Sequence, residues 1–94
     1  MEVIEHEPHF WFLLEEAGEL YLDVNCQLSA VGFSVIVRLT EYEAQAYRSE
    51  GRDSVVRLAE DVEQHPLTAY RERDLSSEVG PAVHDAVMRW RGAS

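Results

Sequence analysis

The sequence has no lysine and a single cysteine among its 94 residues. The lone thiol, Cys26, excludes an internal disulfide and every zinc motif that needs several thiolates. The lack of lysine excludes catalysis through a lysine Schiff base. A Gly-rich phosphate loop, a G-x-S-x-G motif, an H-E-x-x-H motif and an EF-hand loop are absent as well. These absences exclude the enzyme classes that such short motifs identify.

Positive charge is also scarce. Eight basic residues oppose 18 acidic ones, which gives a net charge of -10. Nucleic-acid binding is therefore not expected, because phosphate contacts supply much of its affinity. The apolar run Phe10–Leu14 is too short for a signal sequence or a membrane span, and acidic residues precede it. We expect a cytoplasmic protein that does not bind membranes.

Period-two alternation of apolar residues predicts three strands, at His9–Glu15, Glu19–Cys26 and Gly32–Leu39. The connections between them are short, which favours an antiparallel β-meander. Residues 1–8 precede the first strand, and we expect them to form a loosely ordered N-terminal arm. The whole chain, residues 1–94, is expected to be a single small domain.

The pairing of the strands determines which side chains face the helices. Pairing Glu15 with Glu19 in the first hairpin, and Val24 with Val35 in the second, gives one apolar face for the helices to cover. Large apolar side chains remain on the other face, and a contiguous patch of this kind usually binds a partner. The members of this predicted outer patch are Trp11, Leu13, Tyr21 and Ile36.

Helical periodicity replaces the alternation after Thr40. Thr40 and Glu43 have the spacing of a capping box, and the apolar positions that follow recur every three or four residues. Gly51 falls within this stripe. Residues 41–64 therefore form either one helix, which the unbroken stripe favours, or two helices with Asp53 capping the second.

A last helix is expected from Pro81 to just before Gly92, since proline suits a first helical position and glycine follows helix ends. The predicted fold class is thus α+β. It consists of a three-stranded antiparallel β-meander followed by two or three α-helices packed on one face of the sheet.

In such a meander, the first hairpin turn and the end of the third strand lie at the same end of the sheet. Carboxylates from both segments would gather there and form an acidic pole, which suits a basic partner. A divalent cation is the second candidate for this pole. The members of the acidic pole are Glu15, Glu16, Glu19, Glu41 and Glu43.

Cys26 and the histidines are the obvious candidates for nucleophilic or metal chemistry. Cys26 lies on the apolar face of its predicted strand, where a free thiol behaves as a small hydrophobic residue. His6 and His9 are three residues apart on an extended segment and so point to opposite faces, and Pro8 prevents a helix there. We therefore predict no catalytic, metal-binding or cofactor-binding residue, and no cofactor.

Together these features favour a small acidic, non-catalytic protein-interaction module, such as an inhibitor or immunity-type protein for a basic partner. The apolar first strand lies at an edge of the predicted sheet, so we also expect a homodimer formed by edge pairing or by packing around Trp11. The alternative function is a small-molecule-binding protein or an enzyme. Its pocket would lie between sheet and helices near Asn25 and Cys26.

Overall fold

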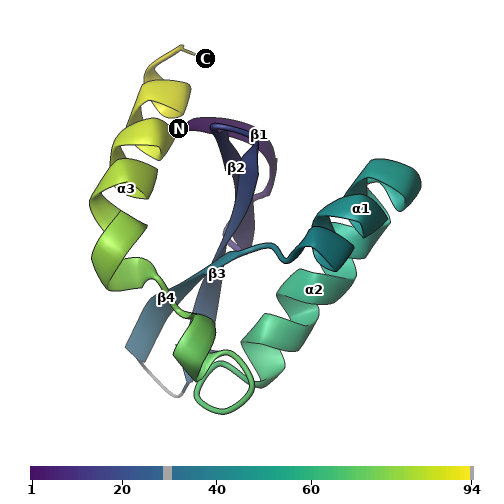
Figure 1. Ribbon diagram of the computed structural model, residues 1–94. Coiled ribbons are helices and arrows are strands. Elements are labelled where there is room, and N and C mark those ends of the chain that lie inside the picture. The colour runs from purple at the N-terminus through teal and green to yellow at the C-terminus, as the bar shows by residue number, and fades with distance from the viewer. Residues whose placement is uncertain (29–30, 94) are drawn as a thin grey trace.

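The computed structural model describes residues 1–28 and 31–93 of the chain (Figure 1). Within these residues the strands are β1 (Glu2–Glu7), β2 (Trp11–Glu16), β3 (Glu19–Leu28) and β4 (Val31–Arg38). The helices that follow are α1 (Glu41–Glu50), α2 (Arg52–Gln64), the 3-10 turn η1 (Arg71–Arg73) and α3 (Ser76–Ala93). The strands form one antiparallel sheet in the order β1-β2-β3-β4. The predicted α+β class and the meander are therefore confirmed.

The sheet has one strand more than the three that were predicted. Glu2–Glu7, within the expected N-terminal arm, forms β1 and pairs antiparallel with β2. A register shift between Val3 and Glu5 interrupts the alternation of this strand, which is why it lacks a clear period-two pattern. β1 is an edge strand, and its acidic side chains protect that edge from pairing with other chains.

The first hairpin pairs one residue out of the predicted register. Glu16 lies opposite Glu19, where Glu15 was expected, so the loop contains only Ala17 and Gly18. Both loop residues have positive φ angles, 52° and 84°, as a two-residue type I′ turn requires. A shift of one residue moves every side chain of the strand to the opposite face. The second hairpin has the predicted register.

Helices cover both faces of the sheet, not one as predicted (Figure 1). α1 and α2 lie against one face, and α3 crosses the other. The larger core, under α1 and α2, includes the buried residues Trp11, Leu13, Leu22, Val24, Cys26, Val35, Val37, Val55, Ala59 and Val62. The smaller core, under α3, contains the buried residues Leu14, Ile36, Val83, Ala86 and Val87.

Residues 41–64 form two helices, not the single helix that the apolar stripe favours. The predicted capping box is present at the start of α1, with hydrogen bonds of 3.1 and 2.9 Å between Thr40 and Glu43. α1 ends at Gly51, whose φ of 76° and ψ of -148° are open almost only to glycine. Asp53 does not cap α2, because Gly51 occupies that position without a side-chain bond.

Gly51→Ala should destabilise the protein by about 1–2 kcal/mol, because alanine pays a steric penalty in this backbone conformation. A Cβ atom added at Gly51 meets no atom within 4 Å, so backbone strain alone would carry the effect. Gly92→Ala is the matched control. It adds a methyl group to open space in the last turn of α3, where alanine is favoured by up to about 1 kcal/mol. Urea midpoints that move in the same direction for both variants would contradict this prediction.

α3 extends beyond both ends of its predicted range, 81–91, and begins at Ser76. Asp74 sets this start, since its Oδ1 accepts the Ser76 N–H at 3.0 Å and the Ile36 N–H at 3.1 Å. The Leu75 N–H in turn donates to the Ile36 carbonyl oxygen at 2.7 Å. The segment before α3 is therefore bonded to the outer edge of β4, which positions the helix over the sheet.

Candidate functional site

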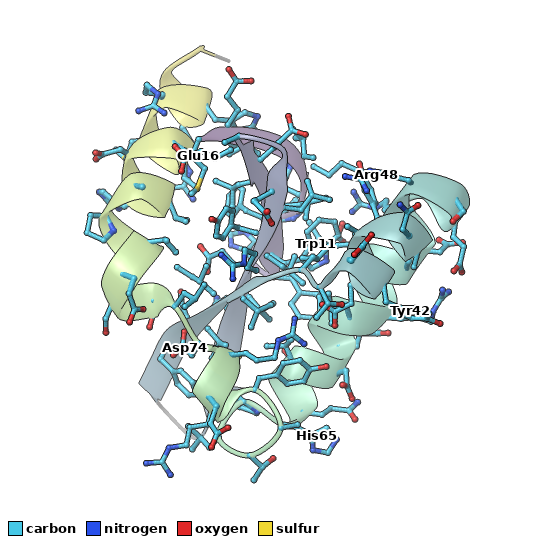
Figure 2. All side chains as sticks on the ribbon, viewed as in Figure 1. Trp11, Glu16, Tyr42, Arg48, His65 and Asp74 are labelled. Atoms are coloured by element: carbon cyan, nitrogen blue, oxygen red, sulfur yellow. The ribbon has the colours of Figure 1, made fainter. Side chains whose placement is uncertain are left out.

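The residues of the predicted outer patch are not exposed together on one face. Trp11, Leu13 and Ile36 are at most 3% exposed, and Tyr21 is half-buried. They also belong to two different faces. Trp11, which is labelled in Figure 2, lies with Leu13 in the core under α1 and α2. Tyr21 and Ile36 pack under α3. The exposure predicted for this patch is wrong, because the hairpin register shifts by one residue and α3 covers the remaining face.

The two segments of the acidic pole do meet. A hollow of about 500 Å³ is lined by Glu19 from the β2–β3 turn and by Glu41 from the start of α1. Glu15 acts near the other end of α1, where its charge adds to the raised pKa of Tyr47, about 12, which arises mainly from a hydrogen bond to Glu5 and from burial. Two arginines also line the hollow, Arg38 and Arg48. The pole therefore carries charges of both signs.

The other two carboxylates of the pole have cationic partners. Glu16 pairs with the N-terminal ammonium group at 3.3 Å. Glu43 accepts two hydrogen bonds from the Arg73 guanidinium, at 2.6 and 3.0 Å. Burial raises the pKa of Glu43, but the bonds from Arg73 and Thr40 outweigh it and hold the pKa below its ordinary value. These two carboxylates are already engaged within the protein.

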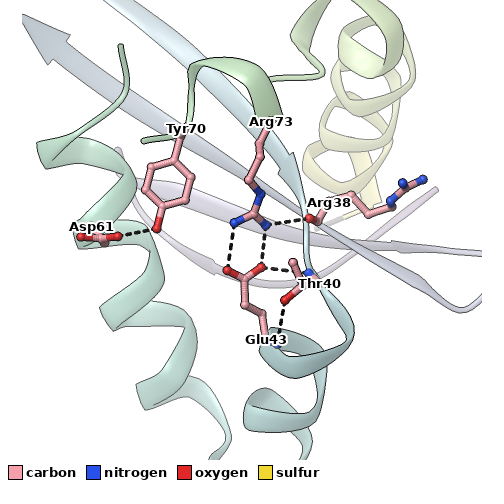
Figure 3. Close-up of polar contacts among 6 residues, drawn as sticks. All are labelled: Arg38, Thr40, Glu43, Asp61, Tyr70 and Arg73. Carbon is pink, nitrogen blue, oxygen red and sulfur yellow. Dashed lines mark hydrogen bonds and ion pairs between the residues drawn. The ribbon is translucent and has the colours of Figure 1, made fainter. Parts of the chain in front are cut away.

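Arg73 also ties the segment after α2 to the rest of the fold (Figure 3). Its guanidinium donates to the Arg38 carbonyl oxygen at 3.0 Å and lies over the Tyr70 ring, 5.5 Å from the centroid. The Tyr70 hydroxyl donates to Asp61 of α2, and burial together with this bond raises the pKa of Tyr70 to about 12. We interpret this network as a crosslink between η1, α1, α2 and β4 that serves the fold.

The outer surface of α1 and α2 carries an exposed aromatic side chain. Tyr42, in the first turn of α1, is 84% exposed. Beside it, a hollow of about 190 Å³ lies between the two helices. Ala46 and Leu58 line this hollow together with the ion-paired Glu50 and Arg57. An exposed tyrosine next to a partly apolar hollow with charged neighbours resembles the centre of a protein–protein interface.

A second group of polar residues lies under α3. Asp23, in the middle of β3, pairs with Phe12 on β2 and with Ile36 on β4. Its side chain is half-buried and bonded to the Ser34 side chain. Two hollows of about 300 and 330 Å³ adjoin here, and both are lined by Phe12, Asp23, Ser34 and Arg91. His9, Asn25 and His84 supply further polar groups to one hollow or the other.

The carboxyl of Asp23 is electrostatically unusual. Burial first, and then the charge of Asp74, raise its pKa from 3.8 to about 6, against the lowering effect of the Ser34 bond. Among the described residues, no cationic side chain contributes to this shift. A desolvated carboxyl in a hollow is costly to maintain and is typical of functional sites.

The predicted pocket near Asn25 and Cys26 is divided between the two faces of the sheet. Asn25 lines a hollow under α3, and its Nδ2 donates to the His9 carbonyl oxygen at 3.2 Å. Cys26 is buried on the other face, where burial and then the charges of nearby carboxylates, Glu63 first, raise the pKa of its thiol to about 11. The thiol is thus protonated and shielded.

Sequence reasoning did not select Asp23, Ser34 or His84. The signal that was available is a carboxyl at an alternating position of a central strand, where an apolar residue would be usual. The prediction left the sheet face that carries Asp23 open to solvent, and on a solvated face a carboxyl is ordinary.

Within residues 1–28 and 31–93, no group of three or more metal-ligating side chains could hold an ion. In the same part of the chain, the helices are too short or too polar to cross a membrane. Comparisons with protein-family models, with curated proteins and with solved structures find no match to this chain.

Proposed function

We propose that this chain is a small acidic protein-interaction module that binds a basic partner, as an inhibitor or immunity-type protein does. The observation that carries the proposal is Tyr42. Its ring is 84% exposed beside a hollow that could accept a partner side chain. Tyrosines at such positions often supply much of the binding energy of an interface, because they bury a large area at a low entropic cost.

Charge supports the same surface. The net charge of -10 favours fast association with a basic protein through long-range attraction. Glu19 and Glu41 line a hollow beside the first turn of α1, the turn that also carries Tyr42. Arg38 and Arg48 line the same hollow, so the partner surface would combine basic groups with at least one acidic group.

A homodimer has less support than it had from the sequence. The predicted dimer depended on Trp11, which is 1% exposed and packs under the protein's own helices. The outer edge of β4 is also partly occupied by the bonds to Asp74 and Leu75. A second copy of this chain is therefore an outcome that the test must exclude.

Tyr42→Ala should weaken binding of the partner by about tenfold or more, and it should change the free energy of unfolding by less than about 0.5 kcal/mol. Both effects follow from the exposure of the ring in the free protein. Affinity capture from a native lysate would identify the partner, and biosensor titration with the purified partner would give the dissociation constants.

Met88→Ala is the matched control, since Met88 is an exposed apolar residue on α3. It should bind the partner as the wild type does. Raised salt should slow the association of the partner with the wild-type protein and with Met88→Ala, because ions screen the long-range attraction between the two charged proteins. Equal capture by the Tyr42→Ala and wild-type baits would overturn the proposal, as would capture of nothing but further copies of the chain.

A second candidate function is the binding of a small molecule under α3. The observation that favours it is the half-buried Asp23 at the junction of the two hollows. A carboxylate and a hydroxyl at the surface of an apolar layer are the kind of orienting groups that ligand pockets use.

A further inference from the structure

We propose that the hollows under α3 bind a small organic cation that carries a primary ammonium or amidinium group, with Asp23 as its counter-ion. This inference assigns a ligand class to the second candidate function and rests on it. It is independent of the surface around Tyr42, which lies on the other side of the sheet.

The position of Asp23 in the fold is the first argument. Its cross-strand neighbours are Phe12 and Ile36, and the helix above this face contributes Val83 and Val87 to the same layer. An apolar residue at this position would complete the small core. A carboxylate costs stability there, and its one side-chain hydrogen bond, with Ser34, does not replace the water it has lost. A bound cation would offset that cost.

The neighbouring acceptors are the second argument. Asn25 and Ser34 are directly paired across β3 and β4, and both side chains line the hollow that Asp23 lines. The amide nitrogen of Asn25 is occupied by the His9 carbonyl, which leaves the amide oxygen as an acceptor. A primary ammonium group has three N–H donors and no acceptor. It therefore matches one carboxylate and two neutral oxygens.

The apolar surface of the hollows is the third argument. The ring of Phe12 lines both hollows, and contacts with the rings of His6 and Trp90 hold it in place. It offers an apolar wall to the hydrocarbon part of a ligand, while its faces contact the His6 ring and the Arg91 guanidinium. The ligand class is thus an amine or amidine attached to a small apolar or aromatic group.

Charged and titratable groups of both signs surround this site. His9 precedes β2, His84 and Arg91 belong to α3, and the charge of Asp74 acts on Asp23 from beside the β4 edge. The Arg91 guanidinium lies over the Phe12 ring, 6.0 Å from its centroid. Because an arginine also favours anions, a decisive test must compare ligands of opposite charge and the same shape.

The test is an NMR titration of the full, ¹⁵N-labelled chain with benzylamine, benzyl alcohol and benzoate near neutral pH. We expect benzylamine to produce saturable shifts at the amides of β3, β4 and α3 that surround Asp23. We also expect it to bind about tenfold more tightly than the other two compounds. Tighter binding of the alcohol or of benzoate at these amides would overturn the ligand class but keep the site. No saturable shift with any probe would overturn the site itself.

Asp23→Asn should weaken benzylamine binding by about tenfold or more. Asp53→Asn is the matched control, because Asp53 is an exposed acid in the first turn of α2, and it should leave the affinity unchanged. Well-dispersed spectra of both variants would exclude unfolding as the cause of weak binding. Equal affinities of the two variants would contradict the role of Asp23.

Discussion

Trp11→Ala should lower the free energy of unfolding by about 3–5 kcal/mol, which is a large part of the stability expected for a domain of this size. The side chain is 1% exposed and packs in the larger core between the sheet and the α1–α2 layer. The guanidinium of Arg52 lies over its ring, 4.8 Å from the centroid. Alanine would leave a cavity that neighbouring side chains cannot fill. Urea denaturation measures the loss.

Trp11→Phe is the informative control. Among the residues that the structure describes, the buried indole N–H of Trp11 has no hydrogen-bond partner. Phenylalanine removes this unpartnered donor and keeps most of the apolar volume, so its cost should be only about 1 kcal/mol. A Trp11→Ala variant with wild-type stability but an altered mass in light scattering would contradict the core position and restore Trp11 as an interface residue.

Asp23→Asn should stabilise the protein by about 2 kcal/mol at pH 8, which raises the melting temperature by about 10 °C, and by much less near pH 4. The pKa of Asp23 rises from 3.8 in the unfolded chain to about 6 in the folded protein. Between these values the folded state holds a proton that the unfolded state has lost. Stability therefore falls as the pH rises through this window, and the asparagine variant escapes that loss. The full shift would give about 3 kcal/mol, which we reduce because the carboxyl is only partly buried.

Thermal melts of both proteins from pH 4 to pH 8 would measure this difference. The charged groups around Asp23, which are His9, Asp74, His84 and Arg91, are common to both proteins. The low pKa of Glu43, which makes stability fall at acidic pH, is also common to both and cancels. A difference in stability that stays constant across this pH range would contradict the pKa assigned to Asp23.

Local patterns accounted for most of the elements, but they missed β1 and did not give all of the boundaries or faces. The capping box at Thr40 needs only neighbouring residues, and so does the strand alternation that sets the second hairpin. The first hairpin depends on Ala17 adopting a φ of 52°, which a non-glycine residue rarely does. The predicted pairing of Glu15 with Glu19 instead implies a three-residue turn, Glu16 to Gly18. This difference of one residue in the loop places Trp11 and Leu13 on the sheet face opposite to the predicted one.

The covering of both faces did have a signal in the sequence. The continuous apolar run Phe10–Leu14 is typical of a strand that is buried on both sides, since a half-buried strand alternates. Contacts between residues that are distant along the chain had no such signal in the sequence. Arg73 and Glu43 are 30 positions apart, and nothing near either of them indicates the other. The environment of Asp23 likewise depends on α3, which follows it by about fifty residues.

The order of the elements along the chain also has a consequence for synthesis. α3 is an 18-residue helix that follows the other described elements, and among them it is the helix that covers the sheet face carrying Leu14 and Ile36. A ribosome adds about 5–20 residues per second, so α3 takes about 1–4 s to make, whereas hairpins form within microseconds. Until α3 has been made, the nascent sheet therefore has one apolar face exposed to water. An exposed apolar face promotes aggregation and chaperone binding, and the packing of α3 against it removes this surface from solvent.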